Sequence, residues 1–147
     1  MEKIAVSACL CGIPCRMDGK AKPNDFVIGL YQRGIAVPVY PEQDGDLTTP
    51  RDPSEQRDGR VYSSKGMDVT DAFVKGASID LQKAKDNGCH TASLKSKSPS
   101  CGVGLVHNGK FDGGLVEGDG VFTKMLKENG FECIVDTEAE EKFKGKV

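Results

Sequence analysis

Cysteines and one glutamate in three short segments are the residue types in this chain best suited to chemistry. Cys9, Cys11 and Cys15 form one group, Cys101 follows a Ser-Pro-Ser sequence, and Glu42 follows Tyr-Pro. Thiolates without a matching set of histidines favour zinc, copper(I) or an iron–sulfur cluster. At least two of the first three cysteines are therefore expected to be metal ligands, although free cysteine is also a common buried apolar residue.

Each of these segments directly follows a short apolar run that is typical of a β-strand. The runs are residues 3–8, 35–39 and 91–94, and a fourth run covers residues 131–135. In an open α/β sheet, the loops at the carboxyl ends of parallel strands line one crevice, where ligands bind. Residues that are far apart in the sequence are therefore expected to converge on a single site.

Three stretches with apolar residues at helical spacing separate these strands. They cover residues 25–33, 71–87 and 120–129, and each ends at a glycine. The expected cap of the first is Asn24 or Asp25, and that of the third is Asp119. Strands that alternate with helices indicate a parallel sheet built from crossover connections. We therefore predict a single-domain α/β fold over residues 1–147, with a Rossmann-like, mostly parallel sheet flanked by helices.

Three segments depart from this alternation. Residues 103–116 contain Asn108-Gly109, which predicts a β-hairpin insertion with its turn at these two residues. Residues 43–65 are rich in Asp, Pro, Arg, Ser and Gly, which predicts a functional loop or a mobile lid. The charged tail, residues 137–147, is predicted to be a peripheral helix or a frayed end.

The composition limits the class of protein. The formal net charge is −2 at pH 7 and the pI is about 5.7, so a nucleic-acid partner is not expected. No segment approaches the ~20 apolar residues that span a bilayer, and no signal peptide is evident. We expect a cytoplasmic protein that acts on a small molecule and whose six cysteines are metal ligands or core residues rather than disulfide bridges.

Several polar residues and thiols have a structural interpretation beside a functional one. Glu42 is by default a solvated loop residue, but its place beside the cysteine segments favours a role in the site. Arg51 either contacts a polar edge of a substrate or belongs to a stiff proline-rich loop. Cys89 and Cys133 lie at strand starts, away from the predicted site, and are predicted to be packing residues. Neither of the two histidines is expected to bind a metal.

The chain as a whole resembles a known family. The segments that carry the resemblance are Ser7-Ala8-Cys9-Leu10-Cys11-Gly12, Cys15-Arg16, Asp18-Gly19, Pro41-Glu42, Thr49-Pro50-Arg51, Ser98-Pro99-Ser100-Cys101-Gly102 and Gly118-Asp119-Gly120-Val121. They resemble a bacterial family, long labelled as being of unknown function, that includes the thiouracil desulfidases (desulfurases). The resemblance covers residues 3–135.

This resemblance implies an iron–sulfur enzyme. It implies a 4Fe–4S cluster held by only Cys9, Cys15 and Cys101, with a fourth, open iron that binds the sulfur of the substrate. It also implies that Glu42 acts as a general base and that Ser98 orients water or substrate. The implied reaction is the non-redox desulfuration of a small thiolated compound such as thiouracil, which releases sulfide and the oxo product.

Two other classes of protein fit the cysteine pattern. One is a non-enzymatic zinc or iron–sulfur binding module, and the other is a sulfur carrier or redox protein that uses Cys9 and Cys11 as a reactive pair. The chain also departs from the family pattern beside the predicted site. Tyr40 stands where many relatives have cysteine, and Met17 replaces a frequent tyrosine. Both side chains are expected to line the pocket and to affect the substrate range.

Overall fold

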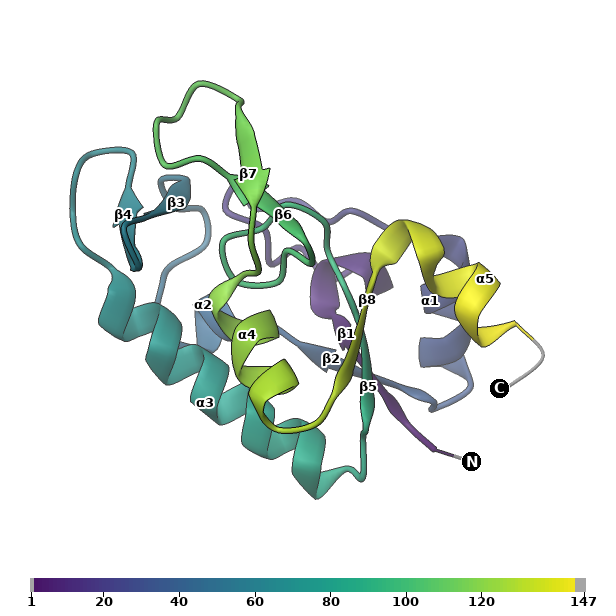
Figure 1. The fold of residues 1–147 in the computed structure, drawn as a ribbon. Helices are drawn as coiled ribbons and strands as arrows, with labels where there is room; N and C mark the ends of the chain where they lie inside the picture. Colours follow the sequence, from purple (N-terminus) through teal and green to yellow (C-terminus); the bar gives the residue numbers. More distant parts are fainter. Residues whose placement is uncertain (1, 145–147) are drawn as a thin grey trace.

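The computed structural model describes residues 2–144, and at its centre lies a four-stranded parallel sheet (Figure 1). The strands are β1 (Ile4–Ser7), β2 (Ala36–Val39), β5 (Thr91–Leu94) and β8 (Glu132–Val135). Their spatial order is β2-β1-β5-β8, and each neighbouring pair is parallel. The predicted α/β fold class is therefore confirmed.

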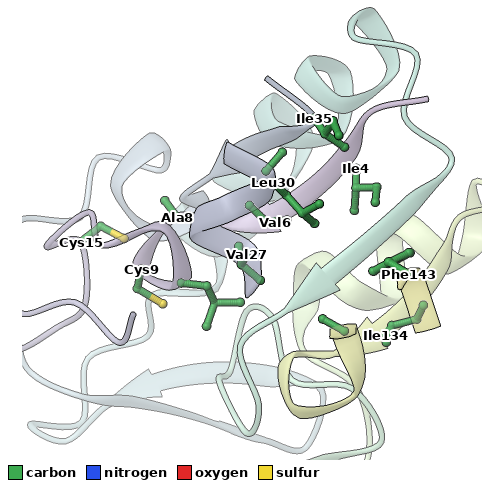
Figure 2. Close-up of a cluster of buried hydrophobic side chains, with 13 residues drawn as sticks. Ile4, Val6, Ala8, Cys9, Cys15, Val27, Leu30, Ile35, Ile134 and Phe143 are labelled. Atoms are coloured by element: carbon green, nitrogen blue, oxygen red, sulfur yellow. The ribbon is translucent and has the colours of Figure 1, made fainter. Parts of the chain in front are cut away.

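Helices cover both faces of this sheet (Figure 1). Ile4 and Val6 of β1 face one way and Ala5 faces the other, because successive side chains of a strand point to opposite sides. The helices on the Ile4 face are α1 (Asp25–Gln32) and α5 (Ala139–Phe143), and those on the Ala5 face are α3 (Thr70–Asp86) and α4 (Val121–Glu128). The buried residues on the Ile4 face form the α1-side cluster, which includes Ile4, Val6, Cys9, Cys15, Val27, Leu30, Ile134 and Phe143 (Figure 2).

The starts of two helices test the predicted caps. Asn24 caps α1 as one of the two expected residues, because its side-chain oxygen accepts a hydrogen bond from Val27 N (3.1 Å). The prediction for Asp119 was wrong, since Gly120 occupies the cap position of α4. Asp119 instead accepts hydrogen bonds from Gly104 N and Lys127 Nζ, both at 2.9 Å, and so ties α4 to a neighbouring loop.

Residues 43–65 contain regular structure instead of the expected loop or mobile lid. The short helix α2 (Pro41–Asp44) leads into the segment, and β3 (Ser54–Arg57) pairs antiparallel with β4 (Arg60–Ser63). Asp58 and Gly59 form the tight turn with φ values of 52° and 78°, as a two-residue hairpin turn requires. The polar composition concealed these strands, because only one large apolar side chain, Val61, is fully buried there.

The predicted hairpin insertion is present, but its turn is longer than expected. β6 (Leu105–His107) pairs with β7 (Leu115–Glu117), and Asn108 N donates to Gly114 O (3.0 Å) across the base of the loop. Asn108-Gly109 therefore starts the loop and is not its turn. The physical reason is a contact with β3: the Oε1 atom of Glu55 accepts hydrogen bonds from Gly109 N and Phe111 N (3.0 and 3.2 Å).

The tail also packs more closely than a peripheral segment. Ala139 and Phe143 of α5 are buried in the α1-side cluster, and Figure 2 shows Phe143 there. Residues 145–147 lie outside the described part of the chain. Cys89 is buried against the Ala5 face and Cys133 packs beside it, so both serve as packing residues, as predicted. None of the helices within residues 2–144 combines the length and apolar character needed to cross a membrane.

Candidate active site

The predicted site residues gather where the connections of the sheet change direction. The chain passes from β1 outward to β2 and from β5 outward to β8, so the loops that follow β1 and β5 diverge. A crevice forms at such a switch point, at the carboxyl ends of the strands. Here it is a cavity of about 410 Å³, and all five residues proposed from the sequence line it: Cys9, Cys15, Glu42, Ser98 and Cys101.

The first cysteine loop turns sharply at the end of β1. It opens with one turn of 3₁₀ helix, η1 (Ala8–Cys11), which ends at Gly12 with φ 90°. Cys9 and Cys15 are buried and lie at the cavity end of the α1-side cluster (Figure 2). Cys11 packs against the same cluster without lining the cavity. The loop therefore presents two of its three thiols to the site.

The second cysteine loop follows β5 and wraps around the hydroxyl of Ser98. The Oγ atom of Ser98 accepts hydrogen bonds from Ser100 N and Cys101 N, both at 3.1 Å, and Gly102 N donates to Ser98 O (2.8 Å). A Cβ atom at Gly102 would lie 2.7 Å from Ser98 O, so the turn requires glycine here. Cys101 is 5% exposed. Ser98 thus holds the Cys101 loop and keeps its own hydroxyl hydrogen for another partner.

Two distant elements brace this second loop. The first turn of α4 contacts it through Gly120 N, which donates to Gly102 O (2.8 Å), and Phe122 N, which donates to Ser100 O (2.9 Å). A Cβ atom at Gly120 would overlap Ser100 O. On the other side, the Nε2 atom of Gln56 on β3 donates to Pro99 O (3.1 Å). The Cys101 loop is consequently fixed from the α4 side and from the β3–β4 hairpin.

The three cavity thiols have shifted pKa values. The interaction between the side chains of Cys9 and Cys15 raises the pKa of Cys9 and lowers that of Cys15. Burial raises the pKa of Cys101 to about 12. Neighbouring thiolate charges at Cys15 and Cys101 raise the pKa of Cys9 further. Three thiolates at these positions therefore need a positively charged partner that offsets their mutual repulsion.

Glu42 reaches the cavity from α2, which directly follows β2. Its Oε2 atom pairs with the guanidinium of Arg51, and both side chains are mostly buried. The same guanidinium donates to Thr49 Oγ1 (3.0 Å) and to Cys15 O (3.3 Å). Arg51 thereby joins the carboxylate to the first cysteine loop. The sequence predicts that Arg51 either contacts the substrate or belongs to a stiff loop, and the structure shows in addition that Arg51 links Glu42 to Cys15.

Close packing between α2 and α3 places Glu42. Gly45 and Gly76 lie at the crossing, where a Cβ atom on Gly45 would overlap Ala72 O and one on Gly76 would overlap Pro41 O. The backbone of α2 therefore rests directly on α3. Asp80, one helical turn beyond Gly76, is fully buried, and neither of its oxygens has a hydrogen-bond partner within residues 2–144. Burial, with Asp44 beside it, raises the pKa of Asp80 to about 8.

Comparison with known proteins identifies the family. Residues 4–138 match the family model described as 2-thiouracil desulfurase. The chain belongs to this family. A curated relative, the uncharacterized protein YbbK of Bacillus subtilis (strain 168), is 35% identical over 145 residues, which cover 92% of this chain and 96% of that protein. A solved structure of TudS, a 4Fe–4S-dependent thiouracil desulfidase, is 38% identical with a TM-score of 0.91, and the match covers 96% of this chain and 95% of that one.

The donor set of this 2-thiouracil desulfurase family member suits a multi-iron cluster. Within residues 2–144, no three His, Cys, Asp or Glu side chains are grouped closely enough to hold a single metal ion. Cys9, Cys15 and Cys101 instead line one shared cavity from two loops. Thiolates without histidine are the soft donors that iron–sulfur clusters take. The donor type and the repulsion between the thiolates both fit such a cluster.

Other residues complete the wall of the cavity in this family member. Tyr40 and Met17 line it, as expected, and the Nζ atom of Lys83 lies 4.7 Å from the centre of the Tyr40 ring. Glu55 of β3 and His107 of β6 also line the cavity and were missed as site residues. No local sequence signal marks them, because the two hairpins bring them to the site only after folding.

Proposed function

We propose that this protein is a 4Fe–4S-dependent desulfidase that acts on a small thiolated compound of the thiouracil type. The observation that carries the proposal is the convergence of three buried thiols and one carboxylate on a single cavity at the switch point of the sheet. Cys9, Cys15 and Cys101 would hold the cluster. When bound, the cluster supplies an open iron, a soft Lewis acid suited to the sulfur of a thiocarbonyl group.

The reaction replaces the sulfur atom of the substrate by an oxygen atom from water, without net electron transfer. Water adds its oxygen to the thiocarbonyl carbon, the carbon–sulfur bond breaks, and the products are the oxo compound and sulfide. Glu42 takes a proton from the attacking water, with Arg51 orienting the carboxylate through its Oε2 atom. The oxygen of Ser98 is already bonded to two backbone N–H groups, so its hydroxyl hydrogen is the part that orients water or substrate.

The alternative functions have less support in the geometry. A sulfur carrier would need Cys9 and Cys11 as a pair, but Cys9 lines the cavity together with Cys15, whereas Cys11 packs against the core and does not line the cavity. A purely structural metal module gives no role to Glu42, which is held in the cavity by a buried ion pair. The enzyme is therefore the function that gives a role to the cavity thiols, Glu42 and Ser98 together.

Anaerobically reconstituted protein tests this assignment. The wild type should bind iron and sulfide as one cluster and release sulfide from 2-thiouracil. Cys101→Ala should lose the cluster, whereas Cys89→Ala, a matched change at a packing thiol, should keep it. Glu42→Gln should keep the cluster and lose ~10²–10⁴-fold in turnover, the usual contribution of a general acid–base group.

Two outcomes would contradict the proposal. A cluster retained in Cys101→Ala with unchanged iron content would remove Cys101 from the ligand set. If cluster-loaded wild type released no sulfide from a panel of thiolated bases, nucleosides and thioamides, a binding module would replace the enzyme.

A further inference from the structure

Lys83 of α3 contacts the junction between β2 and α2 without lining the cavity. Its Nζ atom donates to Pro38 O (2.7 Å) and lies 4.7 Å from the centre of the Tyr40 ring. Pro38 is the third residue of β2, and Tyr40 occupies the cap position of α2. One ammonium group therefore contacts both the end of the strand and the start of the helix that carries Glu42.

The short helix α2 depends on outside contacts for its position. It spans the four residues Pro41–Asp44, and no side chain within residues 2–144 caps its start. A helix of one turn is not stable by itself in water, because nucleation of the first turn is unfavourable. The preceding strand, β2, lies at the edge of the sheet and has β1 as its single neighbour among the described strands. Glu42 is therefore placed by the contacts that hold this junction.

One face of α3 supplies these contacts. Gly76, Asp80 and Lys83 are spaced i, i+4 and i+7, so they lie on the same side of the helix. A Cβ atom at Gly76 would overlap Pro41 O, and Asp80 lies beside Asp44 of α2. Lys83 extends this support beyond α2 to the end of β2.

Both contacts of Lys83 involve its positive charge. A hydrogen bond from an ammonium group is roughly twice as strong as one between neutral groups. A cation over an aromatic ring is attracted by the negative face of the ring, and more strongly where the pair is shielded from water. The helix behind Lys83 is fixed, because Ala77 and Ala84 of α3 are fully buried in the core. Lys83 thus ties the one-turn helix at the cavity to a rigid element.

We propose that Lys83 is a positioning residue for Glu42, because it pins the β2–α2 junction to α3 and so keeps the carboxylate in place to activate water. The proposal rests on the desulfidase function, in which Glu42 is the base. Lys83 does not line the cavity, so it contacts neither the bound substrate nor the cluster. Its loss should lower turnover and leave cluster content and substrate binding unchanged.

Lys83→Met tests this role in cluster-loaded protein. Methionine keeps an unbranched apolar stem and removes the charge. The charge of Lys83 lowers the pKa of Asp80, so its loss keeps Asp80 protonated at neutral pH and adds no buried charge. The kcat for 2-thiouracil should fall about tenfold, within the ~10²-fold that a misplacement of ~1 Å can cost. KM and iron content should stay within about twofold of the wild-type values.

Three comparisons separate positioning from a general structural effect. Lys83→Arg keeps a cation and a donor, so it should restore most of the turnover. Lys85→Met, at an exposed lysine of the same helix whose Nζ atom contacts Asn129 Oδ1 (3.0 Å), should behave as wild type. In the Glu42→Gln background, Lys83→Met should lower turnover by less than about twofold, because effects that act through one shared group do not multiply.

Hydrogen exchange gives a readout that does not depend on turnover. Asp44 N donates to Tyr40 O (3.0 Å) and Gly45 N donates to Pro41 O (2.9 Å), and both bonds hold the turn of α2. Mass spectrometry of the cluster-loaded protein should show residues 41–47 exchanging faster in Lys83→Met than in wild type or Lys83→Arg.

Four results would overturn the role of Lys83. They are wild-type kcat or wild-type exchange in Lys83→Met, loss of iron from that variant, the full loss of turnover in the Glu42→Gln background, and a similar loss in Lys85→Met. An inactive cluster-loaded wild type would instead refute the proposed function, while the exchange measurement would still test the contact of Lys83 with the junction.

Discussion

Replacing Asp80 by asparagine should stabilise the protein, and the gain should grow as the pH rises. Asp80 is fully buried on α3 beneath the α2 crossing. Burial is the largest cause that raises its pKa from 3.8 to about 8, and Asp44 on α2 adds to it, whereas Lys83 on α3 lowers it. At neutral pH the folded protein therefore holds a proton on Asp80 that the unfolded chain has lost.

The size of the effect follows from this one proton. Between the two pKa values the unfolded state binds one proton fewer, so the free energy of unfolding falls by ~1.4 kcal/mol for each pH unit. The stability contributed by Asp80 is complete below pH 3.8 and is lost as the pH rises toward about 8. From pH 5 to pH 7 the loss amounts to roughly 2.7 kcal/mol. Asparagine does not titrate, so the Asp80→Asn variant does not lose this stability.

Urea unfolding of the wild type and Asp80→Asn at pH 5, 6 and 7 measures this difference. Subtracting one variant from the other removes the contribution of every other titrating group. Asp44→Asn is the control, because it removes the neighbouring carboxylate but leaves Asp80 buried. The free energy of unfolding of Asp44→Asn should still fall with pH relative to that of Asp80→Asn, but over a narrower range of pH. Parallel stability curves for wild type and Asp80→Asn would refute the reasoning.

Two glycine contacts give the remaining predictions. Gly76→Ala places a Cβ atom against Pro41 O; α2 should shift, and turnover should fall at least tenfold while iron content stays at the wild-type level. Gly120→Ala places a Cβ atom against Ser100 O and should lower the iron bound per chain after reconstitution. Gly29→Ala in α1, where a Cβ atom meets nothing within 4 Å, is the control for both and should change neither property. Normal turnover in Gly76→Ala would contradict the role of the α2–α3 contact in placing Glu42. Full iron content in Gly120→Ala would contradict the role of the α4 contact in holding the Cys101 loop.

The central sheet could be predicted from the sequence because its signals are local. Each strand is a short apolar run, each long helix shows apolar residues at helical spacing, and strands that alternate with helices make a parallel sheet. Once β1 and β5 are adjacent, the placement of Cys9 and Cys101 in one crevice follows from the topology. Glu42 follows in the same way from the end of β2.

The parts that were missed depend on contacts between distant segments. The β3–β4 hairpin carries an Asp58-Gly59 turn signal, but its strands are polar because one face stays in contact with the site loops rather than with the core. His107 reaches the cavity through strand pairing that no local pattern encodes. The burial of Asp80 could have been predicted from the sequence, because Asp80 shares the helical spacing of the buried residues Phe73, Ala77 and Ala84 on α3.

The division of the proposed cluster ligands between the loops after β1 and β5 has a consequence for maturation during biosynthesis. A nascent chain that has emerged only as far as α3 contains Cys9 and Cys15 but lacks Cys101, the third proposed ligand. Even after Cys101 has emerged, its loop lacks the brace from the first turn of α4, which is synthesised later. With this proposed ligand set, cluster delivery would wait until nearly the whole chain has left the ribosome, and a prematurely terminated chain would have no complete site to fill.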